Sequence, residues 1–81
     1  MQFEVDMDKA LVLITLTLKY SSNLVEQIKD IPGVTDAALV YGPYDAYTVI
    51  EAKNKEELRD SLMKIREVFG VHQTLTCNVI P

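Results

Sequence analysis

The sequence contains one cysteine, no tryptophan, three glycines and three prolines, and each scarcity excludes a class of protein. A single cysteine cannot form an intramolecular disulfide, and residues 1–6 lack the basic and apolar regions of a secretory signal, so a reducing cytoplasm is the expected location. Little glycine and proline beside 48% hydrophobic residues excludes a disordered or collagen-like chain. The 81 residues are therefore expected to fold as one domain over residues 1–81.

Positive charge and long apolar runs are also scarce. Eight Lys and Arg residues stand against twelve Asp and Glu residues, which gives a net charge of −4. This is the wrong sign for binding phosphates or an anionic membrane surface. The longest apolar run, residues 10–14, is far shorter than the roughly 20 residues that cross a bilayer. We therefore expect neither nucleic acid nor a membrane as a direct partner.

Side chains able to carry out catalysis or bind metal are few. His72 and Cys77 are five residues apart on one expected strand, so they point to opposite faces; we expect His72 at the surface and Cys77 as a small buried hydrophobic residue. A zinc or copper site needs at least three clustered ligands, which the sequence does not offer. Residues 19–22 contain no Gly or Arg with which to hold a phosphate group. The sequence thus predicts no catalytic residue, no metal and no cofactor.

Hydrophobic periodicity predicts six elements in the order βαββαβ. Alternation of apolar and polar residues marks strands, whereas apolar residues at i, i+4 and i+7 mark helices. Asn23 and Asn54, each followed three residues later by glutamate, are expected to cap the two helices, which end before Gly33 and at Gly70. The predicted strands are residues 10–18, 34–41, 46–52 and 71–80. Right-handed crossovers then place both helices on one face of a four-stranded antiparallel sheet, a ferredoxin-like α+β fold.

This arrangement leaves the other face of the sheet without a helix. An almost uncharged, exposed sheet face favours association, because contiguous apolar area beyond a few hundred Å² is unusual on a monomer. We therefore predict a homodimer through this open face. The first strand is expected to place Val12, Ile14, Leu16 and Leu18 under the helices; the open face would carry Leu11, Leu13, Thr15, Thr17, Tyr47, Val49, Thr74 and Thr76, with either Leu39 and Tyr41 or Ala38 and Val40.

The segment Gly42-Pro43-Tyr44-Asp45 connects the second and third strands. Gly, Pro and Asp are residues that turns select, so a simple turn is one interpretation. Pro43 excludes the positive φ that a two-residue type I′ turn needs, which predicts a longer or bulged connection. RNA-binding domains share this topology, but Tyr41, Tyr44 and Tyr47 lack the basic groove that such domains use.

Taken together, these segments resemble the effector-binding (RAM) domain of the Lrp/AsnC family of regulators over residues 9–80. The resemblance lies in the apolar residues 10–14, in Ile-Pro-Gly-Val at residues 31–34, in Val-Tyr-Gly-Pro-Tyr-Asp at residues 40–45, in Val-Ile-Glu-Ala at residues 49–52, and in Gly70-Val71 leading to Thr76. It implies dimers that pack through their sheets, dimers that assemble further into octamer-like rings, and small effectors, usually amino acids, bound between dimers beside this connection.

Carried over to this sequence, the resemblance implies four ligand-binding residues. Amides around Gly42 and Tyr44 would hold an α-carboxylate, Asp45 would accept the α-ammonium, and Thr76 would contribute a hydroxyl. Only residues 1–8 precede the first match, so we expect a stand-alone form without the helix-turn-helix domain, able to co-assemble with a full-length regulator. Pro43 and Tyr41 depart from the family pattern.

Three functional interpretations remain open at this point. The leading one is a non-enzymatic small-molecule sensor that couples amino-acid binding to assembly. The second is an oligomerisation or adaptor module without a ligand. The third is an ACT-like amino-acid-binding domain, which would usually carry a glycine after the first strand, where residues 19–22 have none.

Overall fold

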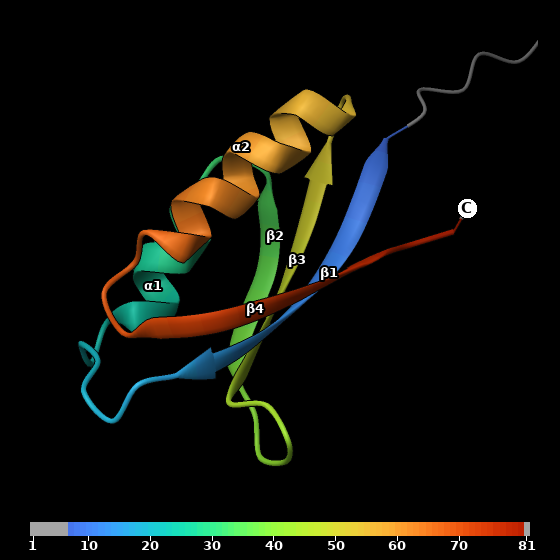
Figure 1. The fold of residues 1–81 in the computed structure, drawn as a ribbon. Coiled ribbons are helices and arrows are strands. Elements are labelled where there is room, and N and C mark those ends of the chain that lie inside the picture. Colours follow the sequence, from blue (N-terminus) through green and yellow to red (C-terminus); the bar gives the residue numbers. More distant parts are fainter. Residues whose placement is uncertain (1–6, 81) are drawn as a thin grey trace, which may run out of the picture.

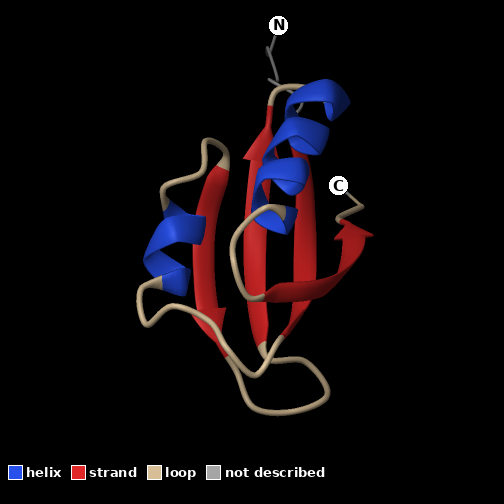
Figure 2. Cartoon of the chain, turned by 60° about the vertical axis from the view of Figure 1, so that its left-hand side comes forward, coloured by secondary structure: helices blue, strands red, loops and turns tan. Residues whose placement is uncertain are grey.

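The structure, a computed structural model, describes residues 7–80 and forms one four-stranded antiparallel sheet with two helices (Figure 1). Residues 1–6, on which the expectation about a secretory signal rests, and Pro81 lie outside the described residues. The strands lie side by side in the order β2-β3-β1-β4, and both helices cover one face of the sheet (Figure 2). The predicted ferredoxin-like α+β fold is confirmed. The elements are β1 (Asp8–Leu16), α1 (Leu24–Lys29), β2 (Val34–Leu39), β3 (Ala46–Ala52), α2 (Lys55–Arg66) and β4 (Val71–Asn78).

The hydrophobic core lies between the sheet and the two helices. Alternate residues in the middle of β1 and along β3 are buried there, as strand geometry requires of a sheet covered on one face. Val12 and Ile14 of β1 and Ile50 of β3 have no exposed surface, and Ile28 and Ile65 pack on them from the helices. Each such side chain contributes about 1.5–3 kcal/mol to folding.

The two helix starts differ, although both begin with asparagine. At α2 the Asn54 Oδ1 accepts the Glu57 N–H at 2.9 Å, and the Glu57 Oε2 accepts the Lys53 N–H at 3.3 Å, so the predicted cap is present. At α1 the predicted cap is wrong: Asn23 accepts a hydrogen bond from the Gln27 side chain instead. The reason is the backbone, because Asn54 is extended (φ −154°, ψ 172°) as capping requires and Asn23 is not (φ −99°, ψ 21°).

Several elements are shorter than their hydrophobic pattern predicts. β1 ends at Leu16 because the Thr17 N–H turns away to the Gly70 carbonyl at 2.8 Å. Leu18 is consequently exposed, and its predicted place under the helices is wrong. α2 ends at Arg66, so Phe69 lies outside it and is 68% exposed. β2 and β4 end at Leu39 and Asn78, two residues before the ends predicted for them.

Strand pairing corrects the predicted membership of the open face. Thr74 and Thr76 lie opposite Ile14 and Val12, which are buried under the helices, so placing these threonines on the open face is wrong. Cys77 of the same strand is exposed rather than buried. The β4 residues on the open face are instead Gln73, Leu75 and Cys77. From β2, Ala38 lies on this face, opposite Tyr47.

The open face is apolar in its middle and polar at its borders. Leu13 lies between Tyr47 and Leu75 in register, with Leu11 and Val49 as a neighbouring pair. Charged side chains lie at the borders of this face. Lys9 and Glu51 form an ion pair at 4.0 Å where β1 begins and β3 ends. On the edge strand β2, Asp36 accepts a hydrogen bond from the Tyr47 hydroxyl at 2.7 Å. Within residues 7–80, neither helix is long and apolar enough to span a membrane.

Candidate functional site

The connection between β2 and β3 projects beyond one end of the sheet (Figure 1). The Val40 N–H donates to the Asp45 carbonyl at 2.9 Å, which closes a loop around residues 41–44. This confirms the prediction from Pro43 that the connection is longer than a two-residue turn. Gly42 has a φ of 139°, a backbone conformation that residues with a Cβ rarely adopt.

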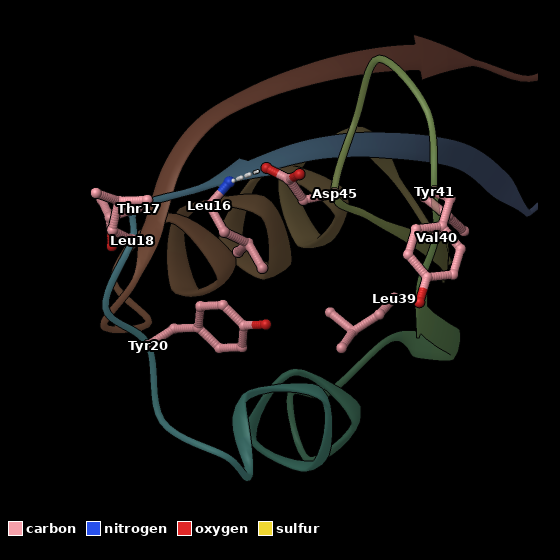
Figure 3. A pocket seen from close by; sticks show the side chains of 8 residues that line it. All are labelled: Leu16, Thr17, Leu18, Tyr20, Leu39, Val40, Tyr41 and Asp45. Carbon is pink, nitrogen blue, oxygen red and sulfur yellow. Dashed lines mark hydrogen bonds between the residues drawn. The ribbon is translucent and has the colours of Figure 1, made fainter.

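Asp45 fastens this loop to the end of β1. Its N–H donates to the Ile14 carbonyl at 2.9 Å, and its Oδ2 accepts the Leu16 N–H at 2.8 Å (Figure 3). The carboxylate thus satisfies an amide at the point where β1 leaves the sheet. The other carboxylate oxygen, Oδ1, has no hydrogen-bond partner within the described residues and remains able to accept one.

Beside Asp45 lies a pocket of about 470 Å³, within the range of small-molecule sites. Its walls come from the end of β1 and the residues that follow it, and from the end of β2 and the β2–β3 loop (Figure 3). Most of the lining side chains are apolar or aromatic, and the only charged one is Asp45. The lining residues are Leu16, Thr17, Leu18, Tyr20, Leu39, Val40, Tyr41 and Asp45.

The four site residues predicted from the sequence do not converge on one pocket within the chain. Asp45 lines the pocket just described, and Gly42 lies in the loop that borders it. Tyr44 lines a different pocket, which it shares with Arg66 and other residues. Thr76 lies on β4, on the face of the sheet that the helices cover, where it lines a pocket with residues of α2 and not with the loop. The expected placement of Thr76 beside the loop is therefore not what the structure shows.

The apolar walls of the pocket are not predicted by the sequence. Leu16, Tyr20 and Leu39 come from segments that are far apart in the sequence and meet only because β1 and β2 end at the same side of the sheet. No local motif marks them. Within residues 7–80 there is also no group of three His, Cys, Asp or Glu side chains placed to hold a metal ion.

Comparison with known proteins identifies a family whose model matches this chain. The family model described as the Lrp/AsnC ligand binding domain matches residues 9–80. An uncharacterized HTH-type transcriptional regulator of Pyrococcus horikoshii is 44% identical over 54 residues, which cover 65% of this chain and 36% of the regulator. A homocitrate synthase of Sulfurisphaera tokodaii is 36% identical over 61 residues, which cover 75% of this chain and 13% of the enzyme. The chain thus spans about a third or less of the length of these relatives.

Two solved structures extend the comparison. A protein of Thermus thermophilus superposes with a TM-score of 0.81 at 32% identity, covering 91% of this chain and 94% of that one. A feast or famine regulatory protein of M. tuberculosis, crystallised in complex with L-methionine, superposes with a TM-score of 0.75 at 21% identity, covering 91% of this chain and 50% of that one. The second likeness is one of fold alone.

Proposed function

The chain belongs to the Lrp/AsnC ligand-binding domain family, and from this membership we propose that it is a non-enzymatic module that binds an amino-acid effector and couples binding to oligomerisation. The whole of residues 1–81 would act as one effector-binding and oligomerisation domain. The regulator relative supports a role in transcription regulation. The homocitrate synthase match covers only 13% of that enzyme, so it supports a shared domain rather than a shared reaction.

The observation that carries the proposal is the carboxylate of Asp45, of which only one oxygen forms a hydrogen bond within the described residues. One of its oxygens holds the Leu16 N–H at 2.8 Å, which fixes the side chain, and the other is free within the described residues at a pocket of about 470 Å³. A fixed carboxylate with a vacant oxygen suits the α-ammonium of an amino acid, since charge-assisted hydrogen bonds are about twice as strong as neutral ones. The regulatory protein solved with L-methionine supports an amino acid as the effector.

The α-carboxylate of the effector needs donors that are not charged side chains, because no Lys or Arg lines the pocket. We assign this role to the backbone amides around Gly42 and Tyr44, on either side of Pro43, since backbone N–H groups at a turn can form an anion-binding concavity. Thr76 lies elsewhere in the chain. Its hydroxyl oxygen is buried and has no hydrogen-bond partner within the described residues, so its proposed contact with the effector would need the surrounding side chains to move.

The open face supports the proposed assembly. A patch that includes Leu13, Val49 and Leu75 lies on the side of the sheet without helices, and covering it in a homodimer would remove apolar area from water. Further assembly of dimers into an octamer-like ring would place the β2–β3 loop between dimers. A full-length Lrp/AsnC regulator is a second proposed partner, and the cytoplasm is the proposed location, where the exposed Cys77 would stay reduced.

Thermal unfolding in the presence of each of the twenty amino acids tests the proposal. An effector at a hundred times its Kd stabilises the folded state by about 2.7 kcal/mol, which raises the melting temperature by roughly 10–20 °C in a chain of this size. Native mass spectrometry of the same samples reports whether the effector changes the distribution of dimers and larger rings.

The outcomes separate the candidate functions. One stabilising amino acid with a change in assembly supports the sensor. Oligomers without stabilisation by any amino acid at millimolar concentration support a ligand-free adaptor and contradict the sensor. Binding that leaves the assembly unchanged favours an ACT-like binding domain.

A further inference from the structure

One wall of the pocket beside Asp45 is formed by Tyr20, in the segment between β1 and α1. Its ring points toward Leu39 across the pocket, and Leu16 lines the same pocket nearer to Asp45 (Figure 3). The Tyr20 hydroxyl makes no hydrogen bond within the described residues, and the side chain is 43% exposed. A ring in this position presents its apolar body to whatever occupies the pocket.

Gly70, in the turn between α2 and β4, packs closely against the backbone of Tyr20. A Cβ built on Gly70 would overlap the Cβ of Tyr20, and it would lie 3.0 Å from the Tyr20 Cα and 3.3 Å from the Lys19 carbonyl. Gly70 also has a φ of +100°, so only glycine fits without strain. The same segment is tied by the Thr17 N–H, which donates to the Gly70 carbonyl at 2.8 Å.

The pocket offers an effector side chain mainly apolar groups, and its polar groups besides Asp45 are hydroxyls and backbone atoms. Once the effector's ammonium lies at Asp45, its side chain faces Leu16, Leu39 and Tyr20, which offer no complementary charge. A buried polar group without a partner loses about 1–3 kcal/mol of binding, whereas an apolar group gains by leaving water.

From these contacts we infer that Tyr20, held in place by Gly70, determines which effector side chains the pocket admits, and that these are apolar. The inference rests on the proposed function, because it concerns the same pocket. The inference goes beyond the proposed function because it assigns selectivity for the effector to a residue outside the β2–β3 loop.

Isothermal calorimetry with L-alanine, L-valine, L-leucine, L-phenylalanine, L-serine, L-aspartate and L-lysine tests the inference. The native chain is expected to bind the larger apolar amino acids at least about tenfold more tightly than serine, aspartate or lysine, a ratio that corresponds to about 1.4 kcal/mol. Tyr20→Ala should reduce the preference for large over small apolar side chains by about tenfold. Tyr20→Phe keeps the ring and should leave every Kd within about twofold, since the hydroxyl has no partner to lose.

Gly70 is tested against a matched glycine. Gly70→Ala should change the preference in the same way as Tyr20→Ala. Gly33→Ala serves as the control, because Gly33 also has a positive φ (+94°) and a crowded Cβ position, 2.8 Å from the Ser61 Oγ, but does not line this pocket. Both alanine variants should lower the melting temperature, and only Gly70→Ala should change the ranking of ligands.

A second measurement does not depend on any ligand. The loss of unfolding free energy caused by Gly70→Ala should be smaller in a Tyr20→Gly background, because that background lacks the Cβ that the new methyl group would meet. An equal loss in both backgrounds would show that the two residues are not coupled.

Failure of the inference differs from failure of the proposed function. If the native chain binds amino acids but prefers polar ones, or if Tyr20→Ala leaves the ranking unchanged, the selectivity assignment is wrong while the sensor stands. If no amino acid gives heat with the native chain, the proposed function fails and the assignment fails with it.

Discussion

Asp45 serves both the fold and the proposed site, so the choice of substitution decides what an experiment at this residue can show. Its Oδ2 accepts the Leu16 N–H at 2.8 Å, and its N–H donates to the Ile14 carbonyl. Replacement by alanine would remove the structural acceptor together with the charge. Replacement by asparagine keeps an oxygen for Leu16 and removes only the charge.

Asp45→Asn should therefore weaken effector binding while preserving the fold. Loss of a charge-assisted hydrogen bond costs about 1.5–3 kcal/mol, which is about a tenfold or greater rise in Kd. Calorimetry gives the Kd and circular dichroism the melting temperature. An unchanged Kd would remove Asp45 from the site, and a collapsed melting temperature would reduce its role to that of a turn residue.

Tyr47 makes a titratable contact on the open face. The hydrogen bond to Asp36, then desolvation, then the negative charge of Asp36 raise the pKa of Tyr47 above its ordinary value of 10.0. Because the folded state holds this proton more tightly than the unfolded state does, the contribution to stability is complete below pH 10.0 and is lost as the pH rises through the raised pKa.

The native chain should accordingly lose stability above about pH 10 more steeply than Tyr47→Phe, which has no proton to release there. Urea unfolding at a series of alkaline pH values measures the difference. Asp36→Asn, which removes the charge and weakens the acceptor, should move the Tyr47 titration back toward that of free tyrosine in an absorbance titration. Identical pH profiles for the native chain and Tyr47→Phe would contradict the role given to this hydrogen bond.

At the scale of the elements, the two helix starts offer a matched pair of asparagines. Asn54→Ala removes an acceptor that holds the Glu57 N–H at 2.9 Å and should lower the unfolding free energy by about 1 kcal/mol. Asn23→Ala removes only a side-chain contact to Gln27 and should cost clearly less. Midpoints of denaturant unfolding compare the two variants. Equal losses would mean that the extended backbone at Asn54 gives no capping advantage.

The same comparison shows what a local pattern can predict about this fold. β3 has the bounds that alternation predicts, because it is an interior strand whose burial alternates at every residue from Ala46 to Ala52. β4 is an edge strand, and most of its residues are exposed on both faces, so composition gives no contrast from which to assign its faces. The faces predicted for Thr74 and Thr76 are therefore wrong, and only pairing with β1 corrects them.

Residues close together in the sequence predict only part of the candidate site, and the rest depends on contacts between segments that are far apart in the sequence. The loop at residues 41–45 and the carboxylate of Asp45 follow from turn chemistry, which acts over a few residues. The partner of that carboxylate, Leu16, and the apolar walls Tyr20 and Leu39 follow from where strands end. Leu18 continues the alternation of β1 and is nevertheless exposed, because the hydrogen bond from Thr17 to Gly70 takes the chain out of the sheet.

At the scale of the whole molecule, the sheet has one face covered by helices and one without them (Figure 2). The uncovered face has Leu13 at its centre, between Tyr47 on β3 and Leu75 on β4. Leu75 is 49% exposed although it is a large apolar side chain. A chain of this size also buries only about 60–65% of its unfolded surface by itself, so covering this face in a dimer would add to its core.

Leu13→Glu should separate the proposed dimer, because two-fold packing of the open faces would bury one new carboxylate from each chain without a partner. An unpaired buried charge costs several kcal/mol, enough to raise a dimer dissociation constant by about a thousandfold or more. Sedimentation at micromolar concentration should then give 9.1 kDa for the variant and at least twice that for the native chain.

Met63→Glu is the control for this experiment, because it adds the same charge at an exposed position of α2, on the helix side of the molecule. It should leave the native mass unchanged. If effector binding depends on assembly, Leu13→Glu should also weaken it although Leu13 does not line the pocket, since a ligand and an oligomer that favour each other must do so reciprocally. A native chain that sediments as a monomer, or a Leu13→Glu variant that still dimerises, would show that the open face is not the interface.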